Sequence, residues 1–126
     1  MRAIVCVISL LCAGSAFAQW VKYAELPGVI SFFDTERVET QGSLRRVWVI
    51  SDFAEPRPDG SRSALVQSEY DCSDQTVRLL HFETFAQTMA KGENILANRP
   101  EFLPGEWRTV PPNSLTAQLM NRLCAI

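Results

Sequence analysis

The sequence of 126 residues has a single histidine, His81, and no two cysteines at CxxC spacing. One histidine and distant cysteines do not make the four-ligand set of a zinc site, so no metal is expected. The few glycines stand singly, which excludes a glycine-rich phosphate loop, and no cofactor is predicted. No apolar run reaches the roughly 20 residues that a membrane-spanning helix needs.

An excess of positive charge is also absent. Lys and Arg total 12 against 14 Asp and Glu, a formal net charge of −2. Arg45 and Arg46 are the only adjacent basic pair, so no basic stripe could follow a phosphate backbone, and nucleic-acid binding is not expected. With 47% hydrophobic and 21% charged residues, the composition is that of one ordinary globular domain.

Residues 1–18 have the three parts of a cleaved secretory signal peptide. Arg2 provides the positive start, residues 3–11 form a short apolar segment, and small residues stand at Ala16 and Ala18. This pattern predicts cleavage between Ala18 and Gln19.

The mature chain, residues 19–126, is then a single exported domain without stable membrane insertion. A lipid anchor at Cys12 is the competing interpretation, but the bulky Leu11 precedes that cysteine where lipoprotein signals have small residues. We therefore expect an unanchored protein in the periplasm, at the cell surface or outside the cell.

Removal of the signal leaves two cysteines, Cys72 and Cys124. In an oxidising compartment one disulfide is the expected state, and two buried free thiols are the alternative. Closing a loop of about 50 residues would stabilise the fold by about 4 kcal/mol in the chain-entropy model.

Short β segments separated by turn residues occupy most of the mature chain. We expect strands at 20–26, 29–34, 44–53, 63–72 and 76–87, and a weak strand at 94–98 after a turn at 91–93. The segment 44–53 has apolar residues at both alternating sets of positions, so it should be a central strand. Alternation also places Cys72 on the core face, and it places His81 on the same face as Val77.

The C-terminal segment should be a helix. Pro111 and Pro112 prevent a helix from passing through them, and Ser114 offers an N-cap hydroxyl. Apolar residues then recur on one helical face up to Leu123, with Cys124 in the last turn. The expected fold is α+β: a small antiparallel sheet of about five to six strands packed against this helix.

Several of these residues occur together in a known family. The order Trp20-Val21, Phe33-Asp34, Val47-Trp48-Val49, Glu69-Tyr70-Asp71-Cys72, Trp107-Arg108-Thr109-Val110-Pro111, Ser114 and Leu123-Cys124 resembles the surface-adhesin protein E family of proteobacteria. The resemblance implies the same sheet-and-helix fold and a bridge from Cys72 to Cys124. It also implies attachment to host extracellular-matrix and serum proteins such as vitronectin and laminin, and no catalysis.

His81 is the candidate for a catalytic histidine, which a hydrolase would pair with a nucleophile and an acid such as Ser68 and Asp71. Ser68 lies within a strand and lacks a nucleophile-elbow motif. A structural histidine is the favoured interpretation, and the chain is not expected to be an enzyme.

Binding is instead expected in loops, since loops on a rigid sheet commonly carry recognition. The two candidates are 54–62 and 90–104, and their candidate side chains are Arg57, Asp59, Arg62 and Arg99. Trp48 and Trp107 are expected to pack in the core. A partner strand or a second copy, forming a homodimer, could also add to an exposed sheet edge.

The resulting prediction is a non-enzymatic exported domain that binds proteins. The first alternative is a periplasmic structural or stress-related accessory protein with no adhesin role. The second is a small-ligand binder that uses the sheet face opposite the helix.

Overall fold

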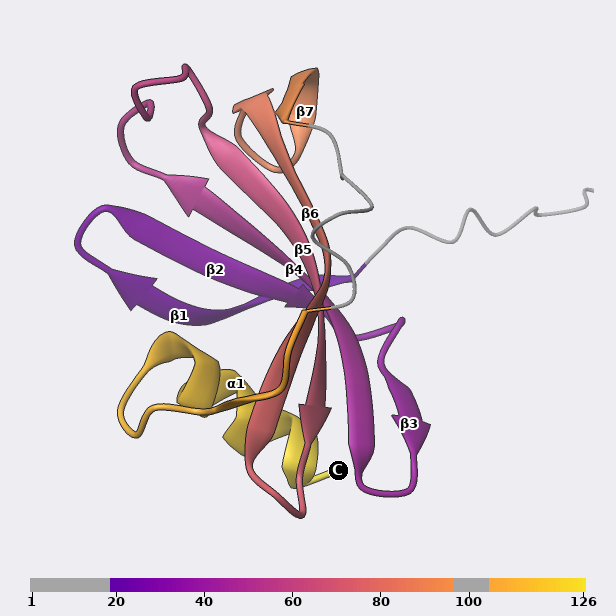
Figure 1. Ribbon diagram of the computed structural model, residues 1–126. Coiled ribbons are helices and arrows are strands. Elements are labelled where there is room, and N and C mark those ends of the chain that lie inside the picture. Colours follow the sequence, from indigo (N-terminus) through magenta and orange to yellow (C-terminus); the bar gives the residue numbers. More distant parts are fainter. Residues whose placement is uncertain (1–18, 97–104) are drawn as a thin grey trace, which may run out of the picture.

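The structure is a computed structural model that describes residues 19–96 and 105–126. In these residues an antiparallel sheet of eight strands packs against one C-terminal helix (Figure 1). The predicted α+β class is confirmed. The strands are β1 (Trp20–Leu26), β2 (Val29–Asp34), β3 (Glu39–Gln41), β4 (Leu44–Phe53), β5 (Ser63–Asp71), β6 (Thr76–Gln87), β7 (Lys91–Leu96) and β8 (Arg108–Thr109), and the helix is α1 (Leu115–Cys124).

Neighbouring strands along the chain are mostly neighbours in the sheet. The order is β1-β2-β4-β5-β6-β7, with β3 paired to β4 and β8 paired to β6. The expectation that residues 44–53 form a central strand is confirmed, because β4 lies between β2 and β5. The described sheet exceeds the expected five to six strands because β3 and β8 have only three and two residues. Strands this short show no periodicity in a sequence.

Two details of the prediction are wrong. Residues 91–93 were expected to form a turn, but β7 begins at Lys91, which pairs with Gln87. The expected last two residues of that strand, 97 and 98, lie outside the described residues. His81 was expected on the face of Val77, but Leu80 has no partner in β5 and forms a bulge, so the alternation reverses after it.

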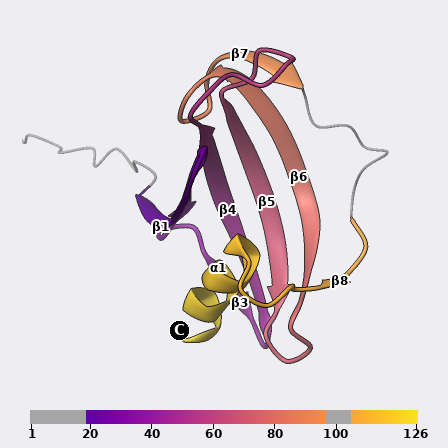
Figure 2. The ribbon, with the colours of Figure 1, turned by 90° about the vertical axis from the view of Figure 1, so that its left-hand side faces the viewer.

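The core lies between α1 and one face of the sheet. The helix buries Ala117, Leu119, Met120 and Leu123. Against them pack the buried side chains Phe33, Val47, Val49, Tyr70 and Val110 from the sheet and the segment before the helix. Figure 2 shows the helix against one side of the curved sheet, at the end away from β7.

The ends of α1 are both fixed. Ser114 accepts a hydrogen bond from the Ala117 amide at 3.0 Å, which is the predicted N-cap. At the other end Arg45 is buried and its Nε donates to the Leu123 carbonyl at 3.3 Å, where a cation complements the helix dipole. Cys72 and Cys124 form a disulfide, and their Cα atoms are 5.7 Å apart. This bridge joins the last turn of α1 to the residue that follows β5.

Candidate protein-binding surface

Three connections meet at the end of the sheet away from α1, and we call this region the loop end. It comprises the β1–β2 turn at 27–28, the loop at 54–62 and the β6–β7 turn at 88–90. Figure 2 shows the 54–62 loop beside β7 at this end. Backbone hydrogen bonds join the parts: Ala54 donates to the Gly28 carbonyl at 3.0 Å, and Arg62 donates to the Phe85 carbonyl at 2.8 Å. The loop is therefore braced by the sheet.

The β6–β7 turn is held in a strained conformation. Met89 and Ala90 have φ of 57° and 56°, the left-handed region that side chains other than glycine disfavour. The Met89 amide donates to Asp52 Oδ1 at 2.7 Å, and the Ala90 amide donates to the Ser63 hydroxyl at 3.0 Å. Asp52 is the penultimate residue of β4 and Ser63 is the first residue of β5, and their hydrogen bonds to the turn amides compensate for the strain.

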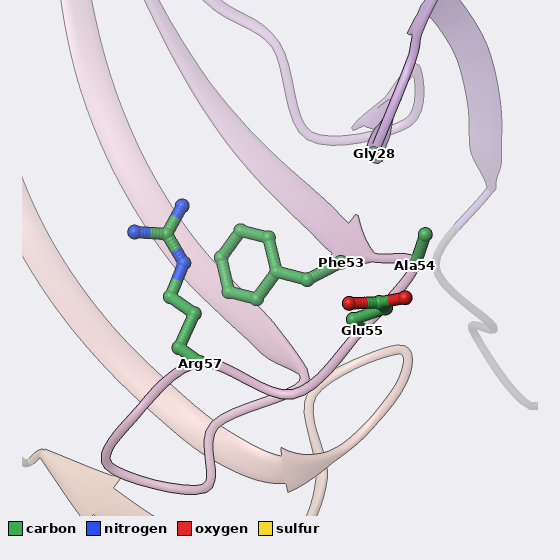
Figure 3. Close-up of a pocket in the computed structure, with 5 residues that line it drawn as sticks. All are labelled: Gly28, Phe53, Ala54, Glu55 and Arg57. Carbon is green, nitrogen blue, oxygen red and sulfur yellow. The ribbon is translucent and has the colours of Figure 1, made fainter.

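An open pocket of about 450 Å³ lies in the loop end, lined by Gly28, Phe53, Ala54, Glu55 and Arg57. The guanidinium carbon of Arg57 lies 3.9 Å from the centroid of the buried Phe53 ring, a cation–π contact that Figure 3 shows. The Arg57 backbone amide also donates to the Ser61 carbonyl at 2.9 Å. Arg57 is thus an exposed cation whose position is set by contacts on two sides.

The four predicted binding side chains do not form one cluster. Arg57 lines the pocket and Arg62 is exposed in the same loop. Asp59 accepts hydrogen bonds from the Ser61 amide at 2.9 Å and hydroxyl at 2.7 Å, which hold the pKa of this carboxyl below its usual value. Asp59 therefore shapes the loop. Arg99 lies outside the described residues.

The sheet face opposite α1 carries arginines and aromatic rings. Glu69 is buried there, and each of its carboxylate oxygens accepts from one arginine: Arg46 Nη2 donates at 3.0 Å and Arg78 Nη2 at 2.6 Å. Arg78 also lies over the Trp107 ring at 4.7 Å. Trp107 was expected in the core but is exposed, so that expectation is wrong. This network was not predicted, because its charges are far apart in the sequence.

His81 belongs to the same face. Its ring meets Trp48 edge-on with centroids 5.2 Å apart, and its Nε2 lies 3.0 Å from Glu83 Oε2. Ser68 pairs with Leu79, before the bulge, and so points to the other face from His81. The hydrolase triad is not assembled. Paired charges fill much of this face in the described residues, which argues against an open aromatic groove for a small ligand.

One edge of the sheet is β1. A bulge interrupts its pairing with β2 between Lys22 and Ala24, and exposed Lys22 pairs with Glu25 at 2.9 Å. Bulges and charges of this kind protect an edge from the addition of another strand.

Among the described residues no group of three or more potential metal ligands occurs, and none of their helices is long and apolar enough to cross a membrane.

Comparison with known proteins gives a family for this geometry. The family model of surface-adhesin protein E matches residues 20–125. The chain belongs to the surface-adhesin protein E family. That match confirms the resemblance in the sequence, and it spans Cys72, Cys124, the loop end and α1.

Solved structures of protein E from Haemophilus influenzae have the same fold as this family member. One is 11% identical, with a TM-score of 0.64 over 88% of this chain and 87% of that chain. A second, from non-typeable Haemophilus influenzae, is 12% identical, with a TM-score of 0.61 over 89% and 79%. No curated protein matches the chain. Surface-adhesin membership implies an exported or cell-surface protein and suggests a non-enzymatic one.

Proposed function

We propose that this chain is an exported, non-enzymatic domain that binds proteins through its loop end, with host extracellular-matrix proteins as the partners that the family suggests. The observation that carries the proposal is the placement of Arg57 over Phe53 in the lining of a pocket. Arginines and aromatic rings are enriched among the side chains that dominate protein interfaces. A braced loop also loses little conformational entropy on binding.

The chemistry of the loop end suggests the kind of segment it would take. Arg57 and Arg62 offer positive charge, whereas the Asp59 carboxylate already accepts hydrogen bonds from Ser61. Leu26, which directly precedes the β1–β2 turn of the loop end, is an exposed large apolar side chain. A partner segment with a carboxylate for Arg57 and an apolar side chain for the pocket would satisfy both features.

A second candidate function is a periplasmic accessory protein with no host ligand. It is favoured by the signal segment, in which Leu11 precedes Cys12 and no lipid attachment is expected. A protein without an anchor has no evident means of staying on the outer surface. Location separates the two candidates.

Binding to immobilised vitronectin and laminin tests the proposal, with the purified exported protein and matched arginine variants. We expect Arg57→Ala to raise Kd at least tenfold, which is about 1.4 kcal/mol. Arg108→Ala removes another exposed arginine, in β8 and away from the loop end, and should leave Kd unchanged. Equal losses in both variants, or binding that neither variant alters, would refute the role of the loop end. Failure of the unaltered protein to bind either matrix protein would favour the accessory role.

A further inference from the structure

Asp34, the last residue of β2, is a carboxylate with no solvent exposure. Its Oδ2 accepts from Arg37 Nε at 2.6 Å, and its Oδ1 accepts from the Glu36 amide at 3.0 Å. A third donor comes from a distant point in the chain: the backbone nitrogen of Gln19 lies 3.2 Å from the same Oδ1. Asp34 therefore links the residue before β1 to the end of β2.

Gln19 is exposed and lies outside a strand, but further hydrogen bonds fix its backbone. Its carbonyl accepts from the Thr35 amide at 3.0 Å and from the Thr35 hydroxyl at 3.2 Å. The next residue, Trp20, pairs directly with Asp34 in the sheet. The nitrogen and the carbonyl of Gln19 are thus both fixed, and this fixes the position of the nitrogen relative to the buried carboxylate.

The Gln19 nitrogen is the atom that predicted signal cleavage would release. Hydrolysis breaks the peptide bond between Ala18 and Gln19, and water supplies the oxygen that leaves Ala18 with a carboxylate. The nitrogen keeps its hydrogen and gains protons to become an α-ammonium. We propose that Asp34 forms a binding site for this new amino terminus, so that processing adds an ion pair that the precursor lacks. The inference rests on the predicted cleavage between Ala18 and Gln19, which is also the basis for export in the proposed function.

The Asp34 carboxylate can bind the α-ammonium of Gln19 and the Arg37 guanidinium at the same time. Arg37 uses Oδ2, whereas Gln19 uses Oδ1, so the two do not compete for one oxygen. Asp34 and Arg37 are the charged side chains that contact this site in the described residues; Glu36 contributes its amide and its side chain is exposed. Burial acts to raise the pKa of Asp34, but the bonds from Arg37, Glu36 and Gln19 hold it below its usual value. The carboxylate is therefore charged at neutral pH.

The pairing has a defined dependence on pH and on the cleavage position. A neighbouring carboxylate raises the pKa of an amine above its ordinary value of about 7.7–8.0. The ion pair is then fully present below that value and is lost as the pH rises through the raised pKa. Cleavage one residue earlier would leave the Gln19 nitrogen in a peptide bond, and cleavage one residue later would remove Gln19.

The exported protein is purified, its amino terminus is read by mass spectrometry, and its amines are dimethylated with carbon-13 for NMR titration. A dimethylated ammonium keeps one N–H for Asp34, and Lys22 and Lys91, the only lysines, serve as internal references. We expect the α-amine pKa to lie about one unit higher in the folded protein than in the same protein in urea. Asp34→Asn should remove the shift, and Glu36→Gln should retain most of it.

Three other outcomes would overturn the inference, and the measured mass and pKa values distinguish them. Equal pKa values in the folded and unfolded protein refute the ion pair, and so does conversion of Gln19 to pyroglutamate, which leaves no amine. In both cases a mass starting at Gln19 would leave the export proposal intact. A mass showing another amino terminus overturns the cleavage prediction and the inference together. Because the comparison of folded and unfolded protein needs no variant, the test survives misfolding of Asp34→Asn.

Discussion

Replacement of Glu69 by glutamine tests the charge network on the face opposite α1. The Glu69 side chain is only 5% exposed, and its two oxygens bind arginines that are 41% and 27% exposed. Removing one member of a fully buried ion pair costs about 3–5 kcal/mol. Here Arg46 and Arg78 can regain water, so the loss reduces to that of charge-assisted hydrogen bonds. We expect Glu69→Gln to lower the free energy of unfolding by about 2 kcal/mol near neutral pH.

The pH dependence of this loss identifies its cause. Burial acts to raise the pKa of Glu69, but hydrogen bonds and attraction from Arg78 and Arg46 hold it below the usual 4.5. A lowered native pKa stabilises the fold above the unfolded value, and that contribution is lost as the pH falls through the native value. A protonated glutamate resembles glutamine, so the two proteins should converge in stability in acid. Urea unfolding followed by tryptophan fluorescence at several pH values measures this.

Glu39→Gln is the matched control, because Glu39 is 70% exposed and lies 3.6 Å from the same Arg46. An exposed pair of this kind contributes at most about 1 kcal/mol. Equal effects of the two substitutions at neutral pH would refute the network as a source of stability. A Glu69→Gln deficit that persists undiminished in acid would show that packing, not charge, causes it.

Three further changes test the fold and the loop end by urea unfolding. Replacing both Cys72 and Cys124 by serine removes a bridge with a sequence separation of 52 and should lower the free energy of unfolding by about 4 kcal/mol. A loss near zero would show that the bridge does not restrict the unfolded chain. Leu119→Ala should cost about 3 kcal/mol because Leu119 is fully buried under the sheet, and a loss below 1 kcal/mol would contradict that packing. Ala90→Gly should stabilise the protein by about 0.5 to 1 kcal/mol because it relieves a positive φ, and destabilisation would show that the turn is not strained.

The longer elements could be predicted because each has a local pattern. Branched and aromatic residues bounded by turn residues marked β1 and β2, an apolar run marked β4, and alternation marked β5 and β6. Two prolines followed by Ser114 marked the start of α1. The bulge at Leu80 could not be predicted in this way, because it depends on how β6 pairs with β5. It reversed the face assigned to His81.

The candidate site was predicted only in part, for a similar reason. Composition singled out the 54–62 loop, and Arg57 does line a pocket there. Its ring partner Phe53 ends β4 and was assigned to that strand alone. The buried Asp34 was missed because a carboxylate at a strand end is most often exposed, and its partner Gln19 is distant in the sequence. Contacts between remote residues leave no local pattern.

Protease treatment of intact producing cells, compared with cells whose outer membrane has been permeabilised, tests the central claim most directly. The account predicts that the domain is degraded on intact cells, as a surface protein that binds host partners must be. Protection until the outer membrane is permeabilised would contradict it, and would leave a periplasmic protein with the adhesin fold and no access to a host ligand.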